Sequence, residues 1–518
     1  MPVIDVAKFD IERLTGLKFE EAAKLLEHVK CEVEEANGER VKIEVTHDRP
    51  DHFSAEGLAR TLKGIAGVET GLPVIKLGRS PIKLVAGHIE ERPYISMAVV
   101  RGVRLDDEAV RQLIQLQEKI HETYGRGRRR IAIGYYDVSK IKPPIYYRRI
   151  SQDDEYTPLG FDKPIKVRDM YQLTEQGRRY SPLINIERPP ALVDSAGQIM
   201  VVIPVLGSEC CKITERTTDV LIDVTGTDPR AVGNALSILI YALLERSGPR
   251  QVELVEGGTG YSHEYAKIET DERAVGDLLG VELSRADFTK YVKMARFDYV
   301  DGHVVVPPYR INVLSWVDVA EEVAVMIGYN QLPREAPRVM AAGRRHRVEV
   351  ATQELRKSLL SMGFTEVNNY VLTDDSVGDF CRPARVANPI SELYTTVRCS
   401  LVPQLVATAA AVKRREVKLF EVGEVVREGR TVRALALLIS REGATLTDGL
   451  SAIKALCHRL GWSCKFKPLE AAWALPSRAA EVVGDVAGYV AEINPDILIK
   501  LRHTTPTVAA ELFIHMQS

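Results

Sequence analysis

The sequence has no apolar run long enough for a membrane span. Its longest runs, Ile199 to Leu206 and Ala235 to Leu244, fall well short of about 20 residues. The first ten residues, MPVIDVAKFD, carry charges where a signal peptide has an apolar core. The seven cysteines include no C-x-x-C pair, so neither a disulfide framework nor a zinc ribbon is predicted. These absences argue against membrane and disulfide-rich secreted proteins, and they predict a soluble protein of the reducing cytoplasm.

A charge excess of one sign is also missing. Lys plus Arg number 69 and Asp plus Glu 71, so any surface for nucleic acid has to be a local patch. The chain of 518 residues is 45% apolar and 27% charged, which is ordinary for a globular protein. A chain of this length predicts three or four domains, each with its own core.

The most distinctive stretch is PPYRINVLSWVDVAEEVAVMIGYNQLP, from Pro307 to Pro333. It predicts a helix over about residues 316–327, with Ser315 as its cap and Gly328 as its stop. Three carboxylates at i, i+3 and i+4 share one face of this helix: Asp318, Glu321 and Glu322. Acids here either complement the helix dipole, by about 0.3–1 kcal/mol each, or bind a hard cation such as Mg²⁺ together with the amide oxygen of Asn312.

The fold class predicted from the pattern of apolar residues is α+β and multidomain. Five segments follow from the shifts in pattern. They are an N-terminal α+β domain (1–75), a polar linker (76–92), a mixed domain (93–255), a small module resembling a winged helix (256–338) and an antiparallel sheet with covering helices (339–518).

Two sites in the mixed domain have competing interpretations. The run Gly125 to Arg130 holds four arginines, which either contact RNA phosphates or form a solvated surface turn: Arg126, Arg128, Arg129 and Arg130. Asp223 and Thr225 stand two apart on one face of a predicted strand. By itself, Asp223 is equally well explained as a cap of the turn before Gly226.

Several of these stretches together resemble one family, the β subunit of phenylalanyl-tRNA synthetase of the archaeal and eukaryotic type. The acidic helix with its Gly-Tyr-Asn close is one match. A second is the turn from Asp48 to Asp51 followed by Ser54, Glu56, Gly57, Ala59 and Arg60. Others are RPYISMAVVRGV, QLQEKIHETYGRGRRRIAIG, KIKPP, TPLGF and IDVTGTDP. The resemblance covers essentially the whole chain.

The resemblance implies that residues 93–255 form an editing domain, which in that family hydrolyses tyrosine wrongly attached to tRNA(Phe). An apolar pocket rejects a ligand with one added hydroxyl only by roughly 100-fold, so a second site that recognises the hydroxyl is needed. By resemblance, Asp223 and Thr225 would line that site and hydrogen-bond the tyrosine.

Besides Asp48, which stands in place of the usual Asn in the N-terminal turn, four positions depart from the family pattern. Val201 and Gly207 replace a Ser and an Asn, and Tyr136 stands where a His is usual. A valine side chain cannot form a hydrogen bond, so editing is either retained or lost while the fold is kept. Asn312 replaces an Asp and removes one negative charge, which weakens the predicted Mg²⁺ site.

The resemblance further implies that residues 339–518 are a class II synthetase-like domain lacking catalytic motifs. Arg398 lies where such a domain clamps the ATP α-phosphate, but no G-x-G-x-G-x-x-R stretch follows it. Aminoacylation chemistry would therefore belong to the partner, the phenylalanyl-tRNA synthetase α subunit, in an α₂β₂ heterotetramer that binds tRNA(Phe). Two alternatives remain, a purely structural, tRNA-positioning subunit and a free-standing aminoacyl-tRNA deacylase.

Overall fold

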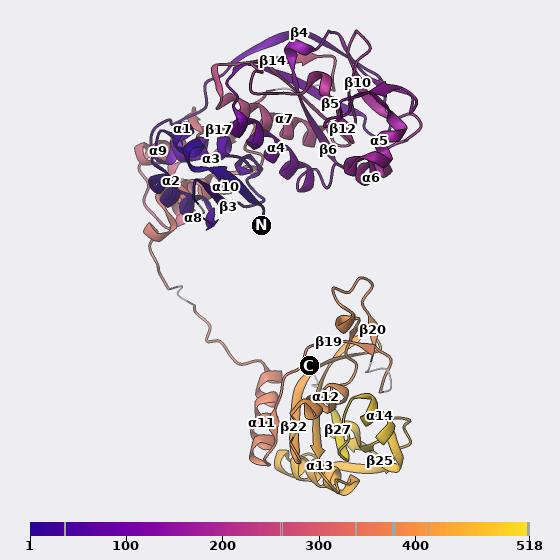
Figure 1. The fold of residues 1–518 in the computed structure, drawn as a ribbon. Coiled ribbons are helices and arrows are strands. Elements are labelled where there is room, and N and C mark those ends of the chain that lie inside the picture. Colours follow the sequence, from indigo (N-terminus) through magenta and orange to yellow (C-terminus); the bar gives the residue numbers. More distant parts are fainter. Residues whose placement is uncertain are drawn as a thin grey trace. The chain divides into compact units, whose positions relative to one another are not determined.

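The structure is a computed structural model that describes residues 1–514 except 36–37, 260, 262, 337–338, 376–379 and 413. The chain forms two compact units, residues 1–336 and 337–518 (Figure 1). Among the described residues, no helix is long and apolar enough to cross a membrane.

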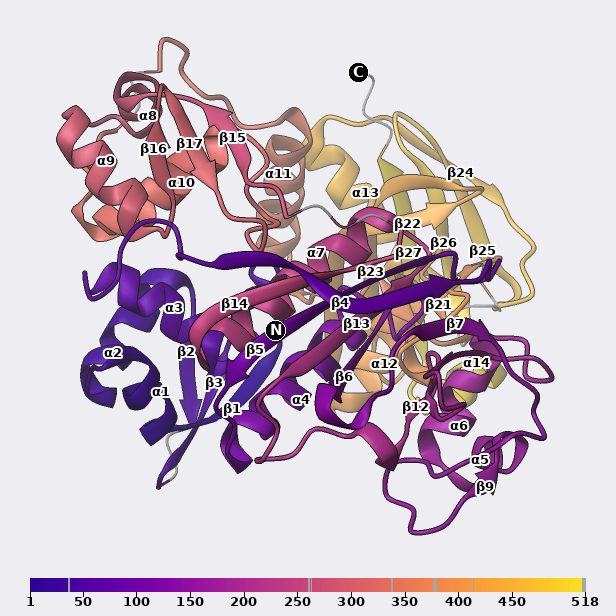
Figure 2. The same cartoon turned by 90° about the horizontal axis from the view of Figure 1, so that it is seen from above.

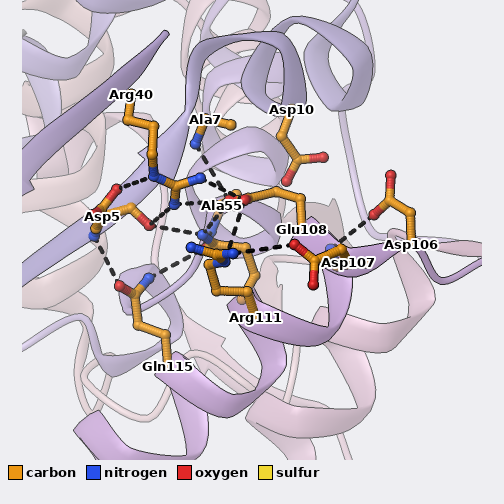
Figure 3. Close-up of polar contacts among 12 residues, drawn as sticks. Asp5, Ala7, Asp10, Arg40, Ala55, Asp106, Asp107, Glu108, Arg111 and Gln115 are labelled. Carbon is orange, nitrogen blue, oxygen red and sulfur yellow. Dashed lines mark hydrogen bonds and ion pairs between the residues drawn. The ribbon is translucent and has the colours of Figure 1, made fainter. Parts of the chain in front are cut away.

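The first unit begins with a three-stranded sheet, in the order β1-β3-β2, and three helices. Their bounds are β1 (Val3–Ala7), α1 (Lys8–Thr15), α2 (Phe19–Leu26), β2 (Glu32–Glu35), β3 (Arg40–Glu44) and α3 (Ala55–Ile65). Polar contacts join this sheet to helix α4 (Asp107–Glu122). Arg40 of β3 pairs with Glu108 of α4 at 2.6 Å and with Asp5 of β1 at 2.7 Å, and Figure 3 shows both contacts.

A nine-stranded sheet forms the centre of the first unit, in the order β12-β11-β10-β7-β4-β14-β5-β13-β6. The bounds in that order are β12 (Leu206–Gly207), β11 (Ile199–Val202), β10 (Pro190–Val193), β7 (Ile145–Arg149), β4 (Lys76–Ala86), β14 (Ser247–Glu256), β5 (Tyr94–Val103), β13 (Val220–Gly226) and β6 (Ile131–Asp137). Residues 76–86, predicted to be linker, form β4. Hydrogen bonds to β14 and β7 outweigh the polar composition of this strand (Figure 2).

The two faces of strands β5, β13 and β6 pack against different layers. One face packs on α4 and α7 (Pro229–Leu244), and the predicted apolar stripe of α4, Leu113, Leu116 and Ile120, is fully buried there. The opposite face, with Leu221 and Tyr136, packs against residues of β7, β10 and β11 in a second cluster. The sheet therefore folds over itself, which brings strands from opposite ends of its order together. Short elements complete this region: β8 (Glu155–Tyr156), β9 (Ile165–Lys166), α5 (Val167–Leu173) and α6 (Glu175–Tyr180).

Residues 266–327 form a small α+β module. Its elements are β15 (Ala266–Glu269), α8 (Glu272–Leu279), α9 (Arg285–Met294), β16 (Asp298–Val300), β17 (His303–Val306) and α10 (Trp316–Ile327). The predicted hairpin turn is present, with positive φ at Asp301 and Gly302 (51° and 77°). Helix α10 has the bounds expected from the sequence and ends at Gly328.

The three segments predicted as separate domains within the first unit share one hydrophobic cluster, which runs from Ile4 to Met326. The turn at Arg49 to Asp51 and helix α3 are buried within this unit. A Cβ added at Gly57 would lie 1.6 Å from the Asp51 carbonyl oxygen, so only glycine allows the turn to pack on α3. Arg60 lies 4.1 Å from the Tyr309 ring centroid and donates to the Tyr241 carbonyl. This sequence signature therefore serves packing between the segments.

The second unit is a seven-stranded sheet in the order β18-β22-β23-β27-β26-β25-β24, antiparallel except for the pair β18 and β22. The bounds are β18 (Thr365–Glu366), β22 (Val417–Arg427), β23 (Arg430–Ser440), β27 (Thr507–Ile514), β26 (Ala487–Ile493), β25 (Ala474–Gly484) and β24 (Cys464–Pro468). Helices α11 (Arg347–Ser361) and α13 (Leu446–Leu460) share one hydrophobic cluster with the sheet, and α12 (Val402–Val412) and α14 (Pro495–Lys500) share the other. A small sheet joins β19 (Leu372–Thr373), β21 (Thr396–Val397) and β20 (Ala384–Arg385). This is the predicted antiparallel sheet with covering helices.

Four of the seven cysteines form disulfides in the second unit, so the prediction of no disulfide framework was wrong. The pairs are Cys381–Cys399 and Cys457–Cys464, with Cα atoms 6.0 and 6.6 Å apart. Both distances lie within the range that a disulfide can bridge. The sequence separations of 18 and 7 residues match no recognised cysteine motif, and the sheet and its connections bring the partners together.

Reduction of the Cys381–Cys399 disulfide should lower the unfolding free energy of residues 337–518 by about 3 kcal/mol, because the closed loop restricts the unfolded chain. Guanidinium unfolding followed by hydrogen exchange, with and without reductant, measures this loss for the unit separately. Because reductant also opens Cys457–Cys464, a Cys381→Ser/Cys399→Ser variant without reductant isolates the loss of about 3 kcal/mol from the longer loop. Replacement of Cys210, which is a free thiol, by serine is the control.

Candidate functional site

A cavity of about 330 Å³ lies in the first unit where the large sheet folds over. Strands β6 and β13 supply Tyr136, Asp223 and Thr225 to its wall, and β11 and β12 supply Val201 and Gly207. These strands stand at opposite ends of the sheet order. The structure therefore brings together the two predicted editing residues and all three positions that depart from the family pattern in that domain.

Asp223 is the buried acid of this cavity, with 2% of its surface exposed. The Tyr136 hydroxyl donates a hydrogen bond to Asp223 Oδ1 at 2.6 Å. Burial raises the pKa of Asp223 to about 7, and the hydrogen bond from Tyr136 and the charge of Arg92 oppose this increase. At neutral pH the carboxyl group is therefore close to its midpoint, so it can both accept and donate a hydrogen bond.

The raised pKa of Asp223 predicts a pH-dependent contribution to stability. Between about pH 4 and pH 7 the folded chain keeps a proton that the unfolded chain has lost. The unfolding free energy of the wild type, relative to Asp223→Asn, should therefore fall as the pH rises through this window and stay level above it. Denaturant unfolding at a series of pH values measures the difference, with Asp162→Asn as an exposed control. An increase with pH would contradict the assignment.

Thr225 is fully buried beside Arg92. Arg92 donates to the Thr225 carbonyl at 3.0 Å and, from Nε, to the Thr225 hydroxyl at 3.4 Å. It also donates to the Arg128 carbonyl at 2.9 Å. Sequence reasoning missed Arg92, which fell in the predicted linker. The signal that could have found it is its place as the first residue of RPYISMAVVRGV, one of the stretches that resemble the family.

Of the four arginines in the predicted RNA-contacting turn, two are held by contacts within the protein and two are exposed. Arg128 points inward, where it donates to the Pro204 and Val205 carbonyls at 3.0 and 2.9 Å and supports the cavity wall. Arg130 pairs with Asp228 at 2.6 Å. Arg126 and Arg129 are exposed, so only these two present their charge outward without an ion pair among the described residues.

The four predicted Mg²⁺ ligands each have a protein partner. Asp318 accepts from the Leu314 and Ser315 amides as the acid of a capping box, and Glu321 pairs with Lys30 at 2.5 Å. Arg310 pairs with Glu322 and donates to the Asn312 amide oxygen at 3.2 Å.

Two cations of the chain itself therefore neutralise Glu321 and Glu322, and the interpretation of Asp318 as a helix-capping acid applies. Among the described residues, no three His, Cys, Asp or Glu side chains gather as a metal site. In this arrangement Asn312, Asp318, Glu321 and Glu322 do not fit the coordination shell that Mg²⁺ requires.

In the second unit, Arg398 is buried and hydrogen-bonded through Nε and Nη1. Its guanidinium donates to Glu421 Oε1 at 2.6 Å and to the Glu424 carbonyl at 2.8 Å, with further contacts to Asn369 and Gln404. A Cβ added at Gly423 would lie 2.4 Å from Arg398 Nη2, so this glycine makes room for the guanidinium. The ion pair with Glu421 neutralises the guanidinium charge that would otherwise attract a phosphate.

Two family models match the second half of the chain, and a solved structure of an N-terminal fragment covers 63% of it. Residues 332–514 match the family described as the phenylalanyl tRNA synthetase beta chain CLM domain, and residues 268–329 match the tRNA synthetase B5 domain. The solved N-terminal fragment of the phenylalanyl-tRNA synthetase β subunit from Pyrococcus horikoshii is 33% identical. Its TM-score is 0.59, and the match covers 63% of this chain and all of that one.

Full-length relatives give the same result. The chain is 74% identical to the phenylalanine–tRNA ligase β subunit of Pyrobaculum aerophilum, over 99% of this chain and 100% of the relative. It is 38% identical to the β subunit of Thermofilum pendens, over 100% of this chain and 98% of the relative. The chain therefore belongs to the family of phenylalanine–tRNA ligase β subunits, and is a ligase subunit of an aminoacyl-tRNA synthetase.

Proposed function

We propose that this β subunit supports the attachment of phenylalanine to tRNA(Phe) by an α subunit in the cytoplasm, within an α₂β₂ heterotetramer, and that its cavity hydrolyses tyrosine wrongly attached to tRNA(Phe). The observation that carries the editing proposal is Asp223, a buried carboxyl group in the wall of a cavity with mostly apolar lining.

The size and polarity of the cavity suit an aromatic amino acid ester. Its volume of about 330 Å³ lies at the lower end of the range for small-molecule pockets. Apolar side chains such as Ile133, Leu159 and Val201 can contact an aromatic ring. Asp223 offers the hydrogen bond that distinguishes a tyrosine hydroxyl from the bare ring of phenylalanine.

The exposed arginines of the turn after α4 support a tRNA-binding surface on this side of the first unit. Arg126, Gly127 and Arg128 adopt positive φ in succession (52°, 63° and 63°). Such a backbone is strained for arginine, and its strain is typical of functional turns. In the proposal, Arg126 and Arg129 contact phosphates, while Arg128 supports the cavity wall and Arg130 stays paired with Asp228.

A second candidate function is a purely structural, tRNA-positioning subunit without hydrolysis. Two observations favour it: Val201 offers no hydrogen bond to an ester or a water molecule, and Tyr136 already occupies Asp223. The predicted Mg²⁺ site does not enter either proposal, because Arg310 and Lys30 neutralise its carboxylates.

The test is deacylation of tyrosyl-tRNA(Phe) by the complex reconstituted with its α subunit. We expect hydrolysis above the uncatalysed rate in the wild type and a loss of about 100-fold in Asp223→Ala, because the mutant cannot hydrogen-bond the phenol. Asp162→Ala, at an exposed position of the same region, should keep the wild-type rate. Wild-type hydrolysis no faster than background would reject editing and leave the positioning subunit.

A further inference from the structure

Tyr136 and Asp223 face each other across two neighbouring strands. In the antiparallel pair β6 and β13, Asp223 stands opposite Gly134, and Leu221 stands opposite Tyr136. Tyr136 is therefore diagonal to Asp223 on the same face of the sheet, and its ring has to lie back over Gly134 to reach the carboxyl group.

Gly134 makes this contact sterically feasible. A Cβ added at Gly134 would lie 2.2 Å from Tyr136 Oη and 2.3 Å from Asp223 Oδ1. No other residue at this position would leave room for the phenol and the carboxyl group to meet. Gly134 thus provides the space for the contact, and Tyr136 provides the hydroxyl.

The contact is between a phenol and a carboxyl group that are both nearly inaccessible to water, with 3% and 2% of their surfaces exposed. Both groups line the cavity, so Asp223 meets inside it the same functional group that a phenolic ligand would present. A phenol that entered the cavity would have to displace Tyr136 from Asp223 before it could form that hydrogen bond.

We infer that Tyr136 is an internal occupant of the phenol-binding position of this cavity, and that it determines specificity by competing with phenolic ligands for Asp223. The inference rests on the proposed function only for its consequence in editing, where Tyr136 slows the capture of tyrosine. The competition itself is a property of the cavity and exists whether or not the cavity hydrolyses an ester.

The experiment measures binding of p-cresol to the full chain by calorimetry. Tyr136→Ala should bind p-cresol at least about tenfold more tightly than the wild type, because the acceptor and the space of the ring are both freed. This gain should disappear in Tyr136→Ala/Asp223→Ala. Binding of toluene, which has no hydroxyl, measures the effect of the enlarged cavity alone. Equal binding by wild type and Tyr136→Ala, or a gain that survives without Asp223, would overturn the inference.

Tyr136→Phe keeps the packing of the ring and provides a second readout should the alanine variant not fold. The hydrogen bond from Tyr136 lowers the pKa of Asp223, so its removal should raise that pKa, as measured by carboxyl NMR. An unchanged pKa would show that the hydroxyl does not bind Asp223. The editing proposal can fail separately. If Tyr136→Ala gains p-cresol binding but no variant hydrolyses tyrosyl-tRNA, editing is rejected and the competition for Asp223 is retained.

Discussion

Replacing Arg246 by methionine is expected to lower the unfolding free energy of the first unit by about 3–5 kcal/mol. Arg246 makes a bidentate contact with Asp10 at 2.9 and 2.7 Å and donates to Glu56 at 2.6 Å. The three side chains are 0–2% exposed. Burial lowers the pKa of Arg246, but the Glu56 and Asp10 carboxylates more than offset this and raise it, so the group is charged at every accessible pH.

The loss in Arg246→Met comes from the carboxylates left behind. Asp10 keeps a contact with the half-exposed Arg13, but Glu56 loses its only ion-pair partner among the described residues. A buried unpaired carboxylate is the main penalty when one member of such a group is removed. Asp10→Asn and Glu56→Gln in the Arg246→Met background should therefore recover part of the stability.

Hydrogen exchange read by mass spectrometry is the suitable measurement, because a chain with two units has no single unfolding free energy. Arg111→Met is the control. Arg111 is 56% exposed and pairs with the exposed Asp107, so its loss should change stability by at most about 1 kcal/mol. An equally small effect of Arg246→Met would show that the buried group does not hold α1, α3 and the end of α7 together.

Replacing Arg398 by methionine should destabilise the second unit by a similar amount, about 3–5 kcal/mol. Arg398 and Glu421 are 3% and 1% exposed, and the guanidinium also donates to the backbone carbonyls of Glu424 in β22 and of Asn369 in the connection after β18. Its removal leaves the Glu421 carboxylate with the amide groups of Asn369 as its only hydrogen-bond partners in the described part of the chain. The first unit should keep its protection in the same experiment.

An arginine that binds phosphate would respond differently to this substitution. An arginine kept free for a ligand is not needed for folding, so Arg398→Met would then leave stability nearly unchanged. Arg385→Met is the control, because Arg385 is 72% exposed and pairs with the exposed Asp375. A loss below about 1 kcal/mol for Arg398→Met would favour a functional role for the guanidinium over the structural one.

The sequence by itself determined the local elements and the family. Helix α10 has its predicted bounds because Ser315, Asp318 and Gly328 are local signals of helix ends. The stripe of α4 is buried as predicted, because its spacing places those residues on one face. Asp223 and Thr225 share a strand face because residues two apart on a strand point to the same side, and both line the cavity.

Only the tertiary structure decided which partner each polar side chain has. It paired Glu322 with Arg310 and Glu321 with Lys30, turned Arg128 inward, and joined Cys381 to Cys399. It also folded one sheet so that Val201 and Tyr136, from opposite ends of its strand order, line the same cavity. Periodicity describes which face a residue occupies, whereas contacts between distant segments depend on how those faces pack in three dimensions.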